Sequence, residues 1–148
     1  MTENIVRMDA SRMAELIAKR ELSPVEVVQA HLDRIEEVDP KVNAIVALAG
    51  GALEAAKRAE AAILSGAHVG PLHGVPFTVK DAIDTQGVLT QRASPIFKGR
   101  VPDADATVVA RLKAAGGILL AKTNAPEFAY SIETDNLLSG RTNNPWNL

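Results

Sequence analysis

The residue with the clearest chemical potential is a lysine at the end of a short apolar run, GVPFTVKD, at residues 74–81. Side chains alternate between the two faces of a strand, so Lys80 shares a face with Pro76 and Thr78. A lysine at the end of a mostly apolar strand is expected to be partly desolvated, which favours the neutral amine and lets it act as a base. The neighbouring Asp81 would favour the charged form instead. A surface lysine at a strand end remains the alternative.

Two other segments partly match known ligand sites, one a phosphate-binding loop and the other a metal site, but each departs from the pattern. The segment GGILLAKT at 116–123 approaches a phosphate-binding loop, but Ala121 replaces the second glycine and the spacer has the composition of a buried strand. We therefore expect a strand that leads into a turn, with Lys122 at its end. His68 and His73 flank a Gly-Pro loop near two aspartates, yet nothing in their spacing fixes a metal geometry, and ordinary loop histidines are expected.

None of the six serines lies in the G-x-S-x-G turn of a serine hydrolase. Ser23 suits a helix cap, because Pro24 follows it and Glu26 completes a Ser-x-x-Glu capping box. Ser131 and Ser139 lie in the loop-rich C-terminal part, where they could face a site. The remaining serines are expected to be polar turn residues.

Composition excludes several classes of protein. The chain has 148 residues, no cysteine and a formal net charge of −2, with five aromatic residues in all. A disulfide scaffold, a thiolate metal site and a cysteine nucleophile are excluded, and nucleic-acid binding has little support. The longest uncharged apolar stretch, residues 44–53, is far shorter than the ~20 residues that span a bilayer. The charged N-terminus does not resemble a signal peptide, so a soluble cytoplasmic protein is expected.

The order of the predicted elements favours an α/β fold with a buried sheet. Apolar residues at helical spacing predict helices over 10–17 and from Ser23 to Asp39-Pro40, a third that ends at 65–66, and a fourth capped by Asp105 and stopped at Gly116. Short apolar runs predict strands over 42–49, 75–80 and 117–121. A short helix is expected to start at Asn124.

Together these segments resemble the N-terminal part of the amidase signature family. The resemblance rests on GPLHGVPFTVKD (70–81), DADATVVARLKAAGGILLAKTNAPEF (103–128) and SGRTNNPWNL (139–148), and the helical segment 22–48 is similar too. It implies an α/β fold with helices packed around a mixed β-sheet. It also implies that residues 1–148 are the incomplete N-terminal part of a single amidase domain, with 1–40 as a helical arm within it.

Family members hydrolyse amides with a Ser–cis-Ser–Lys triad, so the resemblance implies that Lys80 is the catalytic lysine. By the same resemblance Asn124, Tyr130 and Ser131 border the substrate cavity, and no metal or cofactor is needed. The family's Gly/Ser-rich motif, of the type GGSSGG, does not occur in this sequence. We therefore expect a truncated amidase sequence that has the base without the nucleophile and is inactive alone.

Two alternatives stay open. The chain could belong to the A subunit of the tRNA-dependent amidotransferase, or it could be a non-catalytic binding or scaffold domain. For an amidase the expected partner is a small-molecule amide substrate, with no nucleic acid and no membrane, and a homo-oligomer is possible. Strands without their outer partners would leave apolar edges exposed, so poor solubility or oligomers are expected for the isolated chain.

Overall fold

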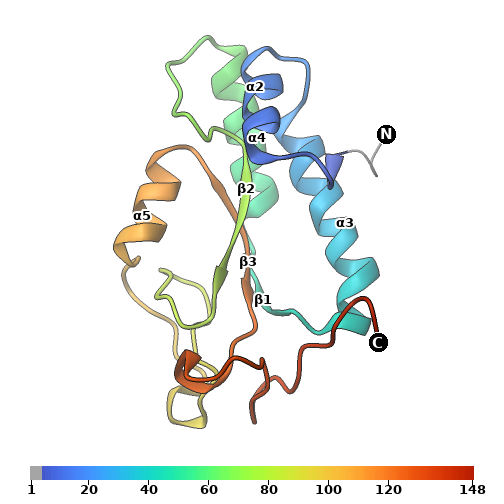
Figure 1. Cartoon of the computed structure of the whole chain (residues 1–148). Helices are drawn as coiled ribbons and strands as arrows, with labels where there is room; N and C mark the ends of the chain where they lie inside the picture. Colours follow the sequence, from blue (N-terminus) through green and yellow to red (C-terminus); the bar gives the residue numbers. More distant parts are fainter. Residues whose placement is uncertain (1–4) are drawn as a thin grey trace. The chain divides into compact units, whose positions relative to one another are not determined.

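A computed structural model of the chain describes residues 5–148 and confirms the α/β class (Figure 1). The first four residues of the predicted 1–40 arm lie outside the described residues. The elements, in chain order, are α2 (Ala10–Ala18), α3 (Pro24–Val42), β1 (Ile45–Leu48), α4 (Ala52–Leu64), β2 (Pro76–Lys80), the 3₁₀ turn η1 (Pro95–Phe97), α5 (Thr107–Ala114), β3 (Ile118–Thr123) and the 3₁₀ turn η2 (Glu127–Ala129). No helix among residues 5–148 has the length and apolar composition needed to cross a membrane.

The predicted capping box at the start of α3 is confirmed. Ser23 Oγ accepts from the backbone N–H groups of Val25, at 3.0 Å, and Glu26, at 3.4 Å. Glu26 Oε2 accepts in return from the Ser23 backbone N–H at 3.3 Å. Such reciprocal bonds satisfy N–H groups that the first turn of a helix leaves without partners.

The predicted end of α3 at Asp39-Pro40 is wrong by two residues, because the helix continues to Val42. Pro40 lies in the last turn, where the proline removes one i→i−4 hydrogen bond close to the point at which the helix stops. The helix ends at Asn43, which has a left-handed φ of +55° that asparagine tolerates. The Asp39 carboxylate then accepts from the N–H groups of Ala44 and Ile45, at 2.7 and 2.9 Å, and so directs the chain into β1.

Two other predicted helix starts are shifted. Helix α5 begins at Thr107, and Asp105 Oδ1 accepts instead from the backbone N–H of Gln86 at 2.8 Å. The short helix expected from Asn124 is the 3₁₀ turn η2, which begins after Pro126.

The three strands form one mixed sheet with β3 in the centre, in the order β1-β3-β2. Strand β1 is antiparallel to β3, with Ile45 opposite Thr123 and Leu48 opposite Ala121. Strands β2 and β3 are parallel, since hydrogen bonds join Ile118 to Val75 at their starts and Asp81 to Thr123 at their ends. Strand β3 runs beyond the predicted 117–121 to Thr123, which places Lys122 inside the sheet rather than in a turn.

The chain divides into two compact units. The first contains the chain up to Arg34, Gly50–Phe77 and Ala110–Leu120, and the second contains Ile35–Ala49, Thr78–Val109 and Ala121–Leu148. An apolar core holds the first unit together, where α2, α3 and α4 surround the start of β2. Its buried members are Met13, Ile17, Val27 and Val75, with Ile63 and Leu72 packed against them. The catalytic and substrate-binding candidates all lie in the second unit.

Two glycines allow two loops of the first unit to approach each other closely. The backbone N–H groups of Leu72 and Gly74 donate to Ala115 and Gly116, each at 2.9 Å. A Cβ at Gly116 would lie 2.7 Å from His73 Cα, and Gly116 also has a φ of +92°. A Cβ at Gly70 would lie 2.4 Å from the Ala115 carbonyl oxygen. The loop before β2 therefore depends on glycine at these positions.

We predict that Gly116→Ala destabilises the chain more than Gly66→Ala. Gly66 also has a positive φ, +74°, but a Cβ there would meet nothing within 4 Å. The control therefore carries only the left-handed penalty of about 1–2 kcal/mol, whereas Gly116→Ala adds a clash with backbone atoms. We expect an additional loss of at least about 2 kcal/mol in the free energy of unfolding, measured by denaturant titration. Equal losses in the two variants would contradict this interpretation of the close approach.

Candidate active site at the end of strand β2

Lys80 is the last residue of β2, and its side chain is exposed. The alternation predicted for this strand is confirmed at its end, where Val79 is buried between exposed Thr78 and Lys80. The expected partial desolvation of Lys80 is absent from the described chain, because the face of β2 that carries it is open.

The neighbouring Asp81 is 2% exposed, and its carboxylate is engaged with the backbone. Its oxygens accept from the N–H groups of Gln91, at 3.0 Å, and Ala93, at 2.8 Å. Between them Arg92 donates its N–H to the Asp81 carbonyl oxygen, and both Arg92 and Ala93 have left-handed φ angles, +54° and +53°. The negative charge of Asp81 therefore organises a tight turn.

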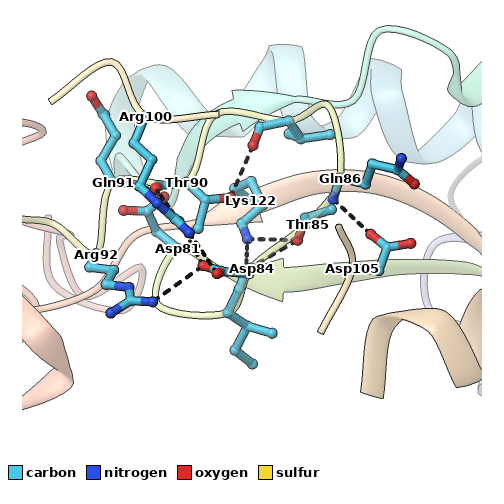
Figure 2. Close-up of polar contacts among 12 residues, drawn as sticks. Asp81, Asp84, Thr85, Gln86, Thr90, Gln91, Arg92, Arg100, Asp105 and Lys122 are labelled. Carbon is cyan, nitrogen blue, oxygen red and sulfur yellow. Dashed lines mark hydrogen bonds and ion pairs between the residues drawn. The ribbon is translucent and has the colours of Figure 1, made fainter. Parts of the chain in front are cut away.

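Lys122 is the buried lysine of this region, with a side chain that is fully buried, and Figure 2 shows its polar contacts. Its ammonium group donates to the Ile83 carbonyl oxygen and, at 2.8 Å, to Thr85 Oγ1. Burial lowers the pKa of Lys122 to about 8, while the nearby charges of Asp81 and Asp84 act in the opposite direction. The sequence does not predict this burial, because the partners of Lys122 lie 37 and 39 residues away and a lysine directly after an apolar run is locally ordinary.

An ion pair lies beside Lys122 (Figure 2). Arg100 donates from both terminal nitrogens to Asp84, each at 2.7 Å, and these hydrogen bonds hold the pKa of Asp84 below its ordinary value. Arg92 Nη2 lies 3.6 Å from Asp84 Oδ1, and the central carbon of the Arg92 guanidinium group lies 5.0 Å from the centre of the Phe97 ring. Ion pairs thus connect the start of the segment between β2 and α5, at Asp84, to Arg92 and Arg100 further along it.

Asn124 follows β3 and is buried, with all four of its hydrogen-bonding positions occupied within the chain. Its Nδ2 donates to the Gly140 carbonyl oxygen at 3.0 Å and to Thr142 Oγ1 at 3.1 Å. Its Oδ1 accepts from the Ala125 N–H at 2.9 Å and from Asn136 Nδ2 at 2.8 Å. The amide therefore ties the segment 136–142 to the end of β3.

Tyr130 and Ser131, by contrast, are exposed, and Tyr130 is 96% accessible. They line an open hollow together with Pro126, Glu127, Phe128 and Asp135. Lys80 does not line this hollow. The structure thus groups Tyr130 with Ser131 and gives Asn124 a different set of neighbours.

The structure does not arrange the residues considered for metal or phosphate binding into a binding site within residues 5–148. His73 Nε2 lies 2.9 Å from the Ala59 carbonyl oxygen. Among residues 5–148, no three His, Asp or Glu side chains gather in a way that could hold a metal ion. The prediction of a strand rather than a phosphate-binding loop in this segment is confirmed, and the strand covers residues 118–123.

We predict that the stability of the chain rises with pH between about 8 and 10.5 because of Lys122. In this interval the unfolded chain binds a proton at Lys122, with an ordinary pKa of 10.5, that the folded chain has released. The free energy of unfolding therefore increases as pH rises, by about 2–3 kcal/mol from this group. Below pH 8 the group is protonated in both states and contributes no slope.

The measurement is denaturant unfolding at several pH values, with Lys122→Met and the exposed-loop variant Lys98→Met compared with the parent chain. Lys98→Met should keep the rise and Lys122→Met should lose it. An unchanged slope in Lys122→Met would show that the pKa shift belongs to another group.

Comparisons with known proteins cover most of this chain but a minor part of each relative. A family model described as Amidase matches residues 26–148. The chain is 45% identical over 145 residues to the A subunit of the glutamyl-tRNA(Gln) amidotransferase of Cutibacterium acnes, a match that covers 97% of this chain and 29% of that protein. The corresponding protein of Nocardia farcinica is 48% identical over 139 residues, covering 93% and 28%.

Solved structures of amidases also match most of this chain over a minor part of their own length. The native peptide amidase from Stenotrophomonas maltophilia matches with a TM-score of 0.87 and 32% identity, covering 95% of this chain and 30% of that one. A fatty acid amide hydrolase matches with a TM-score of 0.93 and 26% identity, covering 99% and 26%. On the match of the family model over residues 26–148, the chain belongs to the amidase signature family and spans about 30% of the length of these relatives.

Proposed function

We propose that this chain is the lysine-bearing, N-terminal part of a single amidase domain, which hydrolyses a carboxylic amide to a carboxylate and ammonia or an amine. The observation that carries the proposal is the position of Lys80 at the end of β2, within the GPLHGVPFTVKD segment of a chain that belongs to this family. Lys80 is the proposed base of a Ser–cis-Ser–Lys triad.

A serine hydroxyl is a weak nucleophile, and a neutral lysine in contact can activate it without a histidine. In the proposed reaction Lys80 accepts a proton through a bridging serine and returns it to the leaving amine. The engagement of Asp81 with the turn at 91–93 supports this role, because it directs the carboxylate of the residue next to Lys80 to backbone amides. We propose that the bridging serine, the nucleophile and the cover over Lys80 come from the part of the protein that corresponds to the remaining length of the relatives.

The substrate is proposed to contact the exposed Tyr130 and Ser131, which line one hollow. Asn124 has no unused hydrogen-bonding position, so its proposed part in the cavity is to fix the segment 136–142. The rest of the substrate pocket would come from residues outside this chain.

A second candidate is the A subunit of a glutamyl-tRNA(Gln) amidotransferase, which would act with partner proteins. It is favoured by the 45% and 48% identities to proteins of that name. The two candidates share the base and the triad, and they differ in whether glutamine or another amide is hydrolysed.

We predict that Lys80→Met lowers the kcat of amide hydrolysis by about 10²- to 10⁴-fold, the contribution typical of a general base. The assay uses the product of the complete reading frame, with glutamine and a panel of peptide and aryl amides as substrates. Lys98→Met, which changes an exposed lysine of the same unit, should retain full activity. The 148-residue chain by itself is expected to hydrolyse none of these amides.

Turnover that survives Lys80→Met would contradict the role of the lysine. Lys80-dependent turnover by the 148-residue chain would instead point to Ser131 or Ser139 as the nucleophile. No turnover of any amide by the complete product would favour a binding or scaffold domain.

A further inference from the structure

Two left-handed turns contact each other in the second unit. Arg92 and Ala93 have φ angles of +54° and +53°, and Phe128 and Ala129 have +52° and +58°. None of the four is glycine, and left-handed residues other than glycine are uncommon and carry strain. Such a conformation persists where the surrounding contacts enforce it, and strained residues of this kind cluster at functional sites.

Three contacts in the described chain join the first turn and the residues directly after it to the second turn. The Phe128 N–H donates to the Arg92 carbonyl oxygen at 2.9 Å. The rings of Phe97 and Phe128 meet edge to face with centres 5.9 Å apart. The third contact is a hydrogen bond from Ser94 Oγ to Glu127 Oε1 at 2.6 Å.

Ser94 is suited to enforce the second turn because it is itself fixed. It is fully buried, its Oγ accepts from the Ile96 N–H at 3.4 Å, and its backbone N–H donates to Gln91 at 3.0 Å. Glu127, in contrast, is exposed and begins η2. A short hydrogen bond from a buried hydroxyl to a carboxylate is among the stronger ones in proteins.

The second turn leads directly into Tyr130 and Ser131. Tyr130 is 96% exposed, so burial of its own side chain contributes little to its placement. The position of these two residues therefore depends on the turn that precedes them. The first turn is held in place by Asp81, the residue after Lys80, through the N–H groups of Gln91 and Ala93.

We propose that Ser94 and Glu127 are positioning residues for the amide substrate. Their hydrogen bond holds residues 126–131 in the left-handed turn, and this turn presents Tyr130 and Ser131 to the substrate. This inference rests on the proposed function. It adds two residues outside the triad: the buried Ser94, and Glu127, which lines the same hollow as Tyr130 and Ser131.

The first test is amide hydrogen exchange, followed by mass spectrometry, in the 148-residue chain. Loss of this charged hydrogen bond in Ser94→Ala or Glu127→Ala should lower protection in the peptide covering 126–131 by about 10- to 100-fold. Glu127→Gln keeps a carbonyl acceptor for the serine and should retain most of the protection. Ser65→Ala removes an exposed serine that bonds the Ala62 carbonyl oxygen in the first unit, and it should leave this peptide unchanged.

Because the two side chains act through one bond, the double variant Ser94→Ala/Glu127→Ala should lose no more protection than either single variant. Additive losses, or losses no larger than that of Ser65→Ala, would overturn the proposal. Should Ser94→Ala fail to fold, the exposed Glu127 still allows the comparison of Glu127→Ala with Glu127→Gln.

The second test is steady-state kinetics of the product of the complete reading frame. Ser94→Ala and Glu127→Ala should raise the KM for the amide about 10-fold, corresponding to the loss of one hydrogen bond, with kcat changed less than about 3-fold. A fall in kcat with an unchanged KM would overturn the positioning role. Lys80→Met should lower kcat without altering exchange at 126–131. If no amide is hydrolysed, the proposed function fails, while the exchange measurement still decides whether the hydrogen bond holds the turn.

Discussion

The buried ammonium group of Lys122 places the strongest physical constraint on the second unit. A charged or polar group removed from water must find hydrogen-bond partners, and here they are the Ile83 carbonyl oxygen and Thr85 Oγ1. These partners lie just after β2, while Lys122 lies on the central strand β3. The buried lysine therefore determines where the chain runs immediately after Lys80.

The rest of the second unit follows the same principle. Irregular backbone leaves N–H and C=O groups that no helix or strand pairs, so polar side chains must satisfy them. Asp81 does this for the turn at 91–93, and Asn124 does it for the segment 136–142. The first unit differs, because an apolar core around Ile17 and Val27 holds it together. The site candidates thus lie in the unit that depends most on polar contacts.

This difference explains what the sequence could predict. The start of α3 and the three strands depend on local signals, such as the Ser23–Glu26 capping box and apolar runs, and the sequence predicts them, although β1 begins three residues later than predicted because α3 extends to Val42. The burial of Lys122 and the bond from Ser94 to Glu127 depend on partners 33 to 39 residues away in the sequence. A lysine after an apolar run and a serine before a proline are locally ordinary, so no spacing rule reveals them.

A lysine that acts as a base must lose its water and must also avoid a counter-charge that keeps it protonated. For the second requirement, the chain directs the carboxylate of Asp81 to the amides of Gln91 and Ala93. The first requirement is not met within this chain, because Lys80 is exposed. The chain spans 26–30% of its solved relatives, the peptide amidase and the fatty acid amide hydrolase. On the proposed function, the polypeptide that supplies the serines must therefore also remove water from Lys80. The lysine would then become a reactive base only when the bridging serine, from which it accepts the proton, lies next to it.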